Sequence, residues 1–389
     1  MTDGAGGPAA ARPAQPRQPG QQEQEREQEQ GQPVRSARSV PSAGSARSVV
    51  VERPGEHRLV TGPQPQPGRG EVRVAVHAAG VCASDREVYD GTRAPGYVSY
   101  PVTPGHEWAG TVDAVGEGAD PGLLGRLTVA EGFRACLRCD RCREGETSLC
   151  TGGYDETGFT RPGAFADWLV LPAQLLHLLP DGADLRAAAL LEPAAVVAAA
   201  VLAAGPRAGE RVAVLGAGTL GMLAVQLLAA HSPAELLAVD PRAQRAEQAT
   251  AMGATHARTP EAADSSGGRD GAGGYDLVLE TAGAPGTAHD ACMLARRGGR
   301  VVLTGMFEAG AQGIDPVHLS VSQLTVRSVF GAPPAAWSYA VRAFGAGLLD
   351  PAPLITHELP LEGFGEAVAL VGSGDPSVGK VLLRPSLSP

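Results

Sequence analysis

The sequence has no apolar run long enough to cross a membrane. A membrane-spanning helix needs roughly 20 consecutive, mostly apolar residues, and the longest run, AAALLEPAAVVAAAVLAAG, contains Glu192 and Pro193. This Ala-rich segment is therefore predicted to be a buried part of a core. The amino terminus lacks the basic and then apolar pattern of a secretory signal, so we expect a cytoplasmic protein without a membrane partner.

An excess of positive charge and a disulfide framework are also lacking. The 42 Asp and Glu residues outnumber the 32 Lys and Arg residues, and the net charge of -10 argues against nucleic acid as a partner. Six cysteines in 389 residues do not suggest a disulfide scaffold. In a reducing cytosol, clustered cysteines are more often metal ligands. Cys292 stands alone in a helical pattern and is predicted to be a buried apolar residue.

The chain is long enough for two cores, and its composition changes along its length. Residues 1–46 are rich in Gln, Glu, Pro, Ser and Arg, which predicts a disordered tail. Residues 47–195 offer short strands separated by Gly and Pro, which predicts a mostly-β domain. Between 196 and 331, short apolar strands alternate with helices, which predicts an α/β domain with a doubly wound parallel sheet. Residues 332–389 have a mixed pattern and could rejoin the first domain.

A glycine fingerprint lies near the start of the α/β domain, in VAVLGAGTLG at 212–221. Gly216, Gly218 and Gly221 follow a buried strand and open a helix, and Asp240 ends the next strand 19 residues later. Such glycines let the backbone approach a pyrophosphate, and the acid can bind both ribose hydroxyls. We interpret the pattern as a dinucleotide site that favours NAD rather than as an ordinary glycine turn. Arg242 and Arg245 lie close to the acid and weaken the preference over NADP. The candidate cofactor-binding residues are Gly216, Gly218, Leu220, Gly221, Asp240, Arg245 and Thr281.

Four cysteines lie within 15 residues, at Cys136, Cys139, Cys142 and Cys150. Four thiolates on one loop can complete the tetrahedral shell of Zn²⁺ and leave no open position, so the spacing predicts a structural zinc site. An iron–sulfur cluster also uses four cysteines, and thiols without a metal are the third interpretation.

A separate pair, Cys82 in GVCASD and His106 in GHEWAG, is a candidate for a catalytic zinc site. Such a site takes three protein ligands and keeps one position open for water or a substrate oxygen. Glu107 and Glu192 are both candidates for the third ligand. Taken alone, Cys82 is more often a buried apolar residue and His106 a core histidine, and the neighbouring motifs favour the metal.

With these residues in view, the chain resembles the zinc-dependent medium-chain dehydrogenase/reductase superfamily. Its marks occur in family order between about residues 47 and 384: GVCASD, TPGHEWAG, the four-cysteine segment, LEPAA, VLGAGTLG and GKVLL. The resemblance implies a GroES-like catalytic domain interrupted by a Rossmann domain, with a catalytic zinc in the cleft between them. It also implies hydride transfer between a nicotinamide and an alcohol or carbonyl carbon, commonly in a homodimer or homotetramer.

The resemblance also assigns roles to individual residues. Cys82 and His106 match the first two zinc ligands, and Glu107 matches an acid that binds zinc in some members and lies just behind the ligands in others. Glu192 stands where classical alcohol dehydrogenases have a cysteine, and a glutamate there resembles the polyol branch. Ser84 matches a residue that passes on the alcohol proton. Glu87 replaces the relay histidine of the family, so it is either a proton shuttle or a surface charge.

The segment DREVYDGTRAPGYVSYPVTPGHEW looks closest to cyclitol and aminocyclitol dehydrogenases of actinomycete antibiotic pathways, and the Ala-, Gly- and Arg-rich composition fits such a source. We therefore expect two Zn²⁺ ions, NAD or NADP, and a polyol or cyclitol substrate whose secondary alcohol is interconverted with a ketone. One alternative is zinc-assisted reduction of an unsaturated cyclitol ketone. Another, from a different class, is a non-catalytic NAD(H)-binding protein.

Overall fold

The computed structural model describes residues 44–260, 274–307, 311 and 313–386, so most of the predicted tail lies outside the described residues. Strand β1 (Ser45–Arg53) pairs with β2 (Glu56–Pro63) as an antiparallel hairpin. Because β1 begins at Ser45, the predicted end of the tail at residue 46 lies inside a strand and is too late. Within the described ranges, no helix is both long and apolar enough to pass through a bilayer.

A seven-stranded sheet forms the first domain, in the order β14-β15-β3-β4-β5-β7, with β6 also paired to β3. Strand β3 is the predicted EVRVAVHAAGV strand, and nearly all of its apolar side chains are buried. The last two strands come from the carboxyl-terminal segment, which returns to this sheet beside β3. The strands are β3 (Glu71–Val81), β4 (Glu107–Val115), β5 (Leu127–Ala130), β6 (Trp168–Pro172), β7 (Leu176–Leu178), β14 (Ile355–Leu359) and β15 (Lys380–Leu383).

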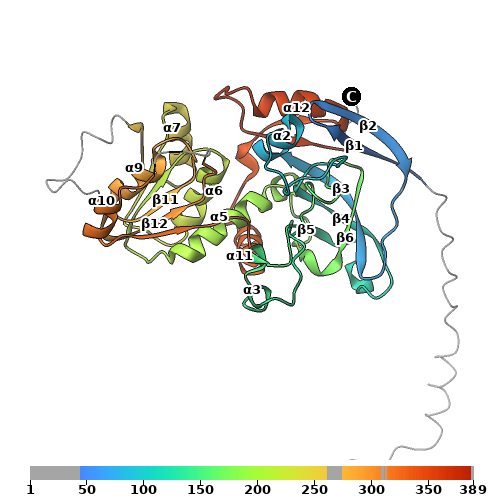
Figure 1. The fold of residues 1–389 in the computed structure, drawn as a ribbon, viewed down its shortest axis with the longest axis horizontal. Helices are drawn as coiled ribbons and strands as arrows, with labels where there is room; N and C mark the ends of the chain where they lie inside the picture. Colours follow the sequence, from blue (N-terminus) through green and yellow to red (C-terminus); the bar gives the residue numbers. More distant parts are fainter. Residues whose placement is uncertain (1–43, 261–273, 308–310, 312, 387–389) are drawn as a thin grey trace, which may run out of the picture. The chain divides into compact units, whose positions relative to one another are not determined.

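Six parallel strands form the second sheet, in the order β10-β9-β8-β11-β12-β13. Figure 1 labels β11 and β12 of this sheet. In chain order this is 3-2-1-4-5-6, the strand order of a Rossmann fold, and the order reverses between β8 and β11. The predicted doubly wound parallel sheet is confirmed. The strands are β8 (Arg211–Leu215), β9 (Glu235–Val239), β10 (His256–Arg258), β11 (Tyr275–Glu280), β12 (Ala295–Leu303) and β13 (Thr325–Ser328).

Helices cover both faces of this parallel sheet. Val212 and Val214 of β8 belong to one apolar core with α6 (Thr219–Ala229), whereas Ala213 and Leu215 belong to another core with α9 (Thr287–Leu294). Successive side chains of a strand point to opposite faces, so a strand buried on both sides reads as a continuous apolar run. Among the residues that the structure describes, this part of the chain also has α7 (Ala243–Ala251), α10 (Pro316–Val321) and α11 (Pro334–Gly345).

Helix α5 (Leu191–Ala204) lies between the seven-stranded sheet of the first domain and the parallel sheet of the second. It packs against α6, α11 and β12, and it also contacts β4 and β5 of the first sheet. This is the Ala-rich segment predicted to be buried, and ten of its residues are buried. Its small side chains allow close packing on several sides. Because α5 contacts both domains, Glu192 in its first turn lines a cavity that is also lined by residues of both domains.

Candidate functional site

Asp85 brings together the two segments that carry Cys82 and His106. Cys82 follows β3 and caps α2 (Ala83–Asp90), and its N–H donates to Asp85 Oδ2 over 2.9 Å. The other carboxylate oxygen accepts the N–H of Gly105 over 3.2 Å and lies 3.4 Å from His106 Nδ1. Asp85 is fully buried. A carboxylate behind a histidine ligand orients its ring and fixes its tautomer, so Asp85 holds both candidate ligands in place.

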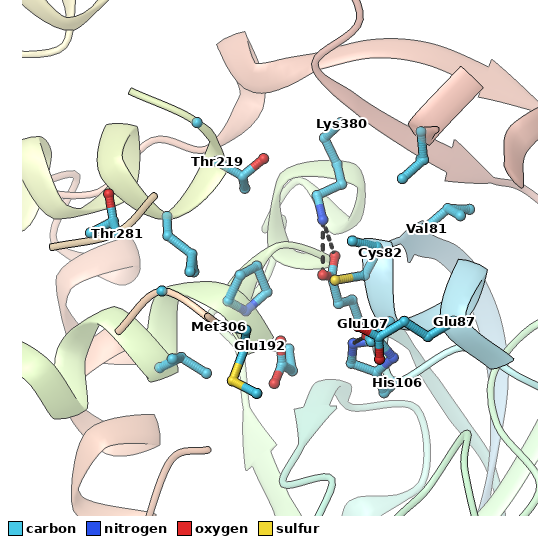
Figure 2. A pocket seen from close by; sticks show the side chains of 18 of the residues that line it. Val81, Cys82, Glu87, His106, Glu107, Glu192, Thr219, Thr281, Met306 and Lys380 are labelled. Carbon is cyan, nitrogen blue, oxygen red and sulfur yellow. Dashed lines mark hydrogen bonds and ion pairs between the residues drawn. The ribbon is translucent and has the colours of Figure 1, made fainter. Parts of the chain in front are cut away.

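The structure brings Cys82, His106 and Glu107 into one cluster of metal-ligand type, with ligand atoms within 4.8 Å of one another. His106 and Glu107 are buried, and Cys82 is half-buried and lines the cavity. Figure 2 shows these three side chains on one side of the pocket. One thiolate, one imidazole and one carboxylate are donors that Zn²⁺ accepts. The donor set therefore fits a zinc ion that also faces the cavity.

Lys380 is ion-paired with Glu107 across an intervening strand. Its Nζ donates to Oε1 and Oε2 over 2.8 and 2.6 Å, and both side chains are almost completely buried. Lys380 is on β15 and Glu107 on β4, with Gly80 of β3 between them. A Cβ on Gly80 would lie 2.3 Å from Glu107 Oε2, so only glycine leaves room for the pair. Burial lowers the pKa of Lys380, but the charges of Glu107, Cys82 and Glu192 and the hydrogen bond to Glu107 together outweigh burial, so the pKa is raised.

Glu192 lines the same cavity from the first turn of α5. Burial is the main reason that its pKa is raised to about 7, with Glu107 adding to the rise and His106 opposing it. A buried carboxylate among other acids is costly, and a nearby cation would relieve that cost. Glu107 thus lies closest to the other donors but already has a cationic partner, whereas Glu192 faces the cavity as a destabilised anion.

The second predicted metal site is also assembled. The sulfur atoms of Cys136, Cys139, Cys142 and Cys150 all lie within 4.8 Å of one another. The Cys136 and Cys142 sulfurs are 4.0 Å apart, close to the roughly 3.8 Å that tetrahedral geometry and a Zn–S bond of about 2.3 Å require. Hydrogen bonds from backbone N–H groups, first that of Thr151, lower the pKa of Cys139 to about 5. These hydrogen bonds favour the thiolate form of Cys139, the form that zinc binds, whereas burial raises the pKa of Cys142 to about 12.

The glycine loop has the geometry expected for a dinucleotide site. Gly216 has φ +93°, and a Cβ on Gly221 would lie 1.7 Å from the carbonyl oxygen of Gly216, so α6 starts in close contact with β8. Thr281 Oγ1 donates to the carbonyl oxygens of Leu215 and Gly216 over 2.8 and 2.9 Å. Gly218, Leu220 and Thr281 line the cavity. The structure places the other two predicted residues, Asp240 and Arg245, in buried positions near the loop.

One cavity of about 610 Å³ joins the zinc donors to this glycine loop. The residues that line it include Ser84, the charged residues Glu87, Arg93 and Glu156, and the aromatic residues Phe133 and Phe159. Ser84 Oγ lies 3.4 Å from His106 Nε2. The distance from this hydroxyl to the zinc donors fits the predicted proton-passing role. Glu87 lines the cavity too, with 47% of its side chain exposed, and among the described residues no hydrogen bond joins it to Ser84.

A chain of polar contacts along this wall was not predicted from the sequence. Arg93 donates to Glu87 Oε2 over 3.3 Å and to the Tyr154 hydroxyl over 2.9 Å, and it stacks on Phe159 at 3.8 Å. The Tyr154 hydroxyl in turn donates to Glu156. Burial raises the pKa of Glu156, although the hydrogen bond from Tyr154 and the charges of His106 and Arg93 oppose the rise. Tyr154, Glu156 and Phe159 lie outside the quoted motifs, and only the fold shows that Glu156 and Phe159 share a wall with the zinc donors.

The fold and the site together define a class of protein. Residues 68–181 match the family model described as alcohol dehydrogenase GroES-like domain, and residues 219–346 match the one described as zinc-binding dehydrogenase. The chain is 31% identical over 329 residues to the 2-dehydro-3-deoxy-L-galactonate 5-dehydrogenase of Pseudoalteromonas atlantica, covering 84% of this chain and 95% of that protein.

Solved structures agree with this assignment. A zinc-binding dehydrogenase from Sinorhizobium meliloti 1021 bound to NADP has a TM-score of 0.82 and 28% identity. A short chain alcohol dehydrogenase from Escherichia coli CFT073 complexed with NADH has a TM-score of 0.81 and 26% identity. Each alignment covers 88% of this chain and 100% of the other.

The chain belongs to the zinc-dependent medium-chain dehydrogenase/reductase superfamily. It has the GroES-like domain and the Rossmann sheet of that superfamily, and it is an oxidoreductase of the alcohol and polyol dehydrogenase class that uses Zn²⁺ and NAD(P). The predicted resemblance and the predicted cofactors are thereby confirmed, and the predicted fold class is confirmed in full.

Proposed function

We propose that this enzyme interconverts a secondary alcohol and a ketone on a polyol, cyclitol or aminocyclitol. The observation that carries the proposal is the cavity wall next to the zinc donors, which holds two carboxylates and a guanidinium, Glu87, Glu156 and Arg93. A site that binds a simple apolar alcohol has mostly hydrophobic walls. Charged groups next to the reacting position instead suit a substrate with several hydroxyl or amino groups, because each buried polar group needs a partner.

The balance of charge on this wall favours a neutral or cationic substrate. Arg93 is bound to Glu87 and to Tyr154, so its charge already has a carboxylate partner. Glu156 has a neutral hydroxyl as its donor. An ammonium or hydroxyl group of the substrate would complete the coordination of Glu156, whereas a phosphate or carboxylate there would be repelled. This supports amino- or hydroxyl-bearing ring substrates, and with them a role in antibiotic or other secondary metabolism.

The residues of this chain divide the work as follows. Cys82 and His106, with Glu107 or Glu192, would hold Zn²⁺, which would supply Lewis-acid chemistry, and the glycine loop would hold the nicotinamide cofactor, which would supply hydride chemistry. Ser84 donates to or accepts from the reacting oxygen and takes its proton. Glu87 lines the same cavity and is the proposed acceptor of that proton. Asp85 keeps the ring of His106 oriented throughout. We further infer a homodimer or homotetramer in the cytoplasm.

The Cys82→Ala variant tests these roles. We expect one zinc ion per chain instead of two, no measurable oxidation of any alcohol, and nearly unchanged NAD(P)H binding, because the glycine loop is on the other domain. Zinc content is measured by metal analysis, and turnover is followed by NAD(P)H fluorescence against polyols, cyclitols and aminocyclitols. Cys292→Ala is the matched control, since Cys292 is buried away from both clusters.

Three results would contradict parts of the proposal. Equal loss of turnover and of cofactor binding in Cys82→Ala would contradict the assignment of roles. Turnover of an unsaturated cyclitol ketone but not of the saturated one would identify the enzyme as an enone reductase. A wild-type protein with two zinc ions that oxidises none of the three substrate groups, and reduces none of their ketones, would contradict the proposed substrate class.

A further inference from the structure

The carboxylate of Asp240 is fully occupied before any cofactor binds. Its Oδ2 accepts the N–H of Ala217 from the glycine loop over 2.8 Å. Its Oδ1 accepts the backbone N–H of Arg242 over 2.9 Å. The Arg242 side chain adds two more bonds, from Nε to Oδ1 over 2.8 Å and from Nη2 to Oδ2 over 3.0 Å. A carboxylate has about four acceptor positions, so this acid has none to spare.

This arrangement changes what Asp240 can do at the adenosine ribose. An acid at the end of the second Rossmann strand selects NAD by accepting hydrogen bonds from the ribose hydroxyls and by repelling a 2′-phosphate. Here the hydroxyls would have to displace a bidentate arginine, one of the stronger hydrogen-bonded pairs in proteins. The repulsion is also cancelled, because the guanidinium neutralises the carboxylate next to it.

Arg242 itself is placed to meet a phosphate. Its side chain is 45% exposed, in contrast to the 2% of Asp240, and it lines the cavity together with Gly218, Thr219 and Leu220. The side-chain bonds to Asp240 use two of the five N–H donors of a guanidinium, so donors are left for a second anion. Arginine suits this task because its planar fork matches the oxygens of a phosphate group.

A second guanidinium adds to the positive charge at this end of the cavity. Arg245 is 8% exposed, and its Nη2 donates to the carbonyl oxygen of Val378 over 2.5 Å. Burial, and after it the nearby charge of Arg242, lower the pKa of Arg245. The group Asp240, Arg242 and Arg245 therefore carries one excess positive charge, whereas a 2′-phosphate carries about 1.5 to 2 negative charges.

We propose that Arg242 makes the adenosine end of this site a 2′-phosphate site, so that the enzyme binds NADP(H) more tightly than NAD(H). Arg242 holds Asp240 with one edge and binds the 2′-phosphate with the other. It is a specificity-determining residue of the cofactor site, and the sequence expectation of a preference for NAD is reversed. The inference concerns the cofactor and is independent of the alcohol substrate.

Binding of four compounds to the zinc-loaded protein tests the inference without any turnover. NADPH and NADH are titrated by fluorescence, and adenosine 2′,5′-bisphosphate and 5′-AMP are used as competitors that differ only at the 2′ position. We expect wild type to prefer the 2′-phosphorylated member of each pair. Arg242→Ala should weaken binding of that member about 10- to 100-fold, the loss expected for a hydrogen bond to a charged group. The same change frees Asp240, so NADH binding should become tighter.

Arg296→Ala is the matched control, because Arg296 is an equally exposed arginine, 51% against 45%, that is paired with Asp276. Arg296→Ala should leave unchanged the preference for NADPH over NADH and the preference for adenosine 2′,5′-bisphosphate over 5′-AMP. A wild type that prefers NADH and 5′-AMP would overturn the proposal, and so would an Arg242→Ala variant that keeps the wild-type preference. Neither result touches the proposed substrate class, which is tested by turnover.

Discussion

At the scale of single residues, the structure contains a buried ion pair, Lys380–Glu107, that the sequence did not predict. Lys380 is the only lysine of the chain, so every other permanently cationic side chain is an arginine. It is buried beside the zinc donors, where its Nζ bonds both oxygens of Glu107. A lysine ammonium is a compact charge that fits above Gly80, whereas a guanidinium is larger and planar.

Lys380→Met is expected to destabilise the protein strongly. Removing the ammonium leaves Glu107 buried without its partner, and breaking a buried pair in this way typically costs about 3–5 kcal/mol. The measurement is the free energy of unfolding from urea denaturation of the zinc-loaded protein. Arg86→Met is the control, because Arg86 and Asp90 form an exposed pair with 46% and 39% side-chain exposure. It should cost no more than about 0.5 kcal/mol. Equal effects of the two substitutions would show that the Lys380–Glu107 pair does not stabilise the fold.

The sequence identified the candidate zinc donors but not the residues that position them. Cys82 and His106 could be found because a thiol and an imidazole within recognisable motifs are rare elsewhere in the chain. Asp85 and Lys380 could not, since their contacts depend on how α2 meets the turn at Gly105 and on the register of β15 against β3. The choice between Glu107 and Glu192 depends in the same way on positions that no spacing encodes.

At the scale of elements, the junction of β8 and α6 predicts different effects for two glycines of one motif. Gly221→Ala would put a Cβ 1.7 Å from the Gly216 carbonyl oxygen, whereas a Cβ on Gly218 has no neighbour within 4 Å, and Gly218 has φ −78°. We expect Gly221→Ala to lower the free energy of unfolding by about 3 kcal/mol, as overpacking does, and Gly218→Ala by less than about 0.5 kcal/mol. Urea denaturation without cofactor measures both. Similar losses for the two variants would contradict the close contact of α6 with β8.

Elements with a strong apolar period were predictable, and their order in space was not. The strand at 71–81 and the helices after the glycine loop and after Asp240 lie where the patterns placed them. The start of β1 was missed because its first residues, Ser45 and Ala46, resemble the polar segment before them and gain their partners only in the hairpin with β2. Pairing of β15 with β3 joins residues about 300 apart in the chain, which local periodicity does not encode.

At the scale of the whole molecule, the four-cysteine loop is flanked on both sides by residues that line the cavity. Phe133, just before the loop, contacts Phe330 of the segment after β13 with ring centroids 6.0 Å apart. A Cβ on Gly331 would lie 2.3 Å from Phe133, so the two segments touch closely. Glu156 and Phe159 lie just after the loop and also line the cavity. A metal that fixes residues 136–150 therefore also fixes both ends of this wall.

Cys150→Ala is expected to remove the structural zinc and to loosen this wall while the Rossmann sheet stays intact. Binding of structural zinc contributes about 10–16 kcal/mol in such sites. We expect loss of one of the four ligands to release the metal, and the loop then loses this stabilisation. The rate of amide hydrogen exchange should rise several-fold in residues 133–158 and stay unchanged in β8 and α6. NAD(P)H binding should persist, and the KM for the alcohol should increase. Metal analysis should find one zinc ion per chain, as in Cys82→Ala, yet only Cys150→Ala should keep turnover. Uniformly faster exchange over both sheets would instead mean that the loop zinc holds the whole fold together, and then the cavity wall would have no separate dependence on it.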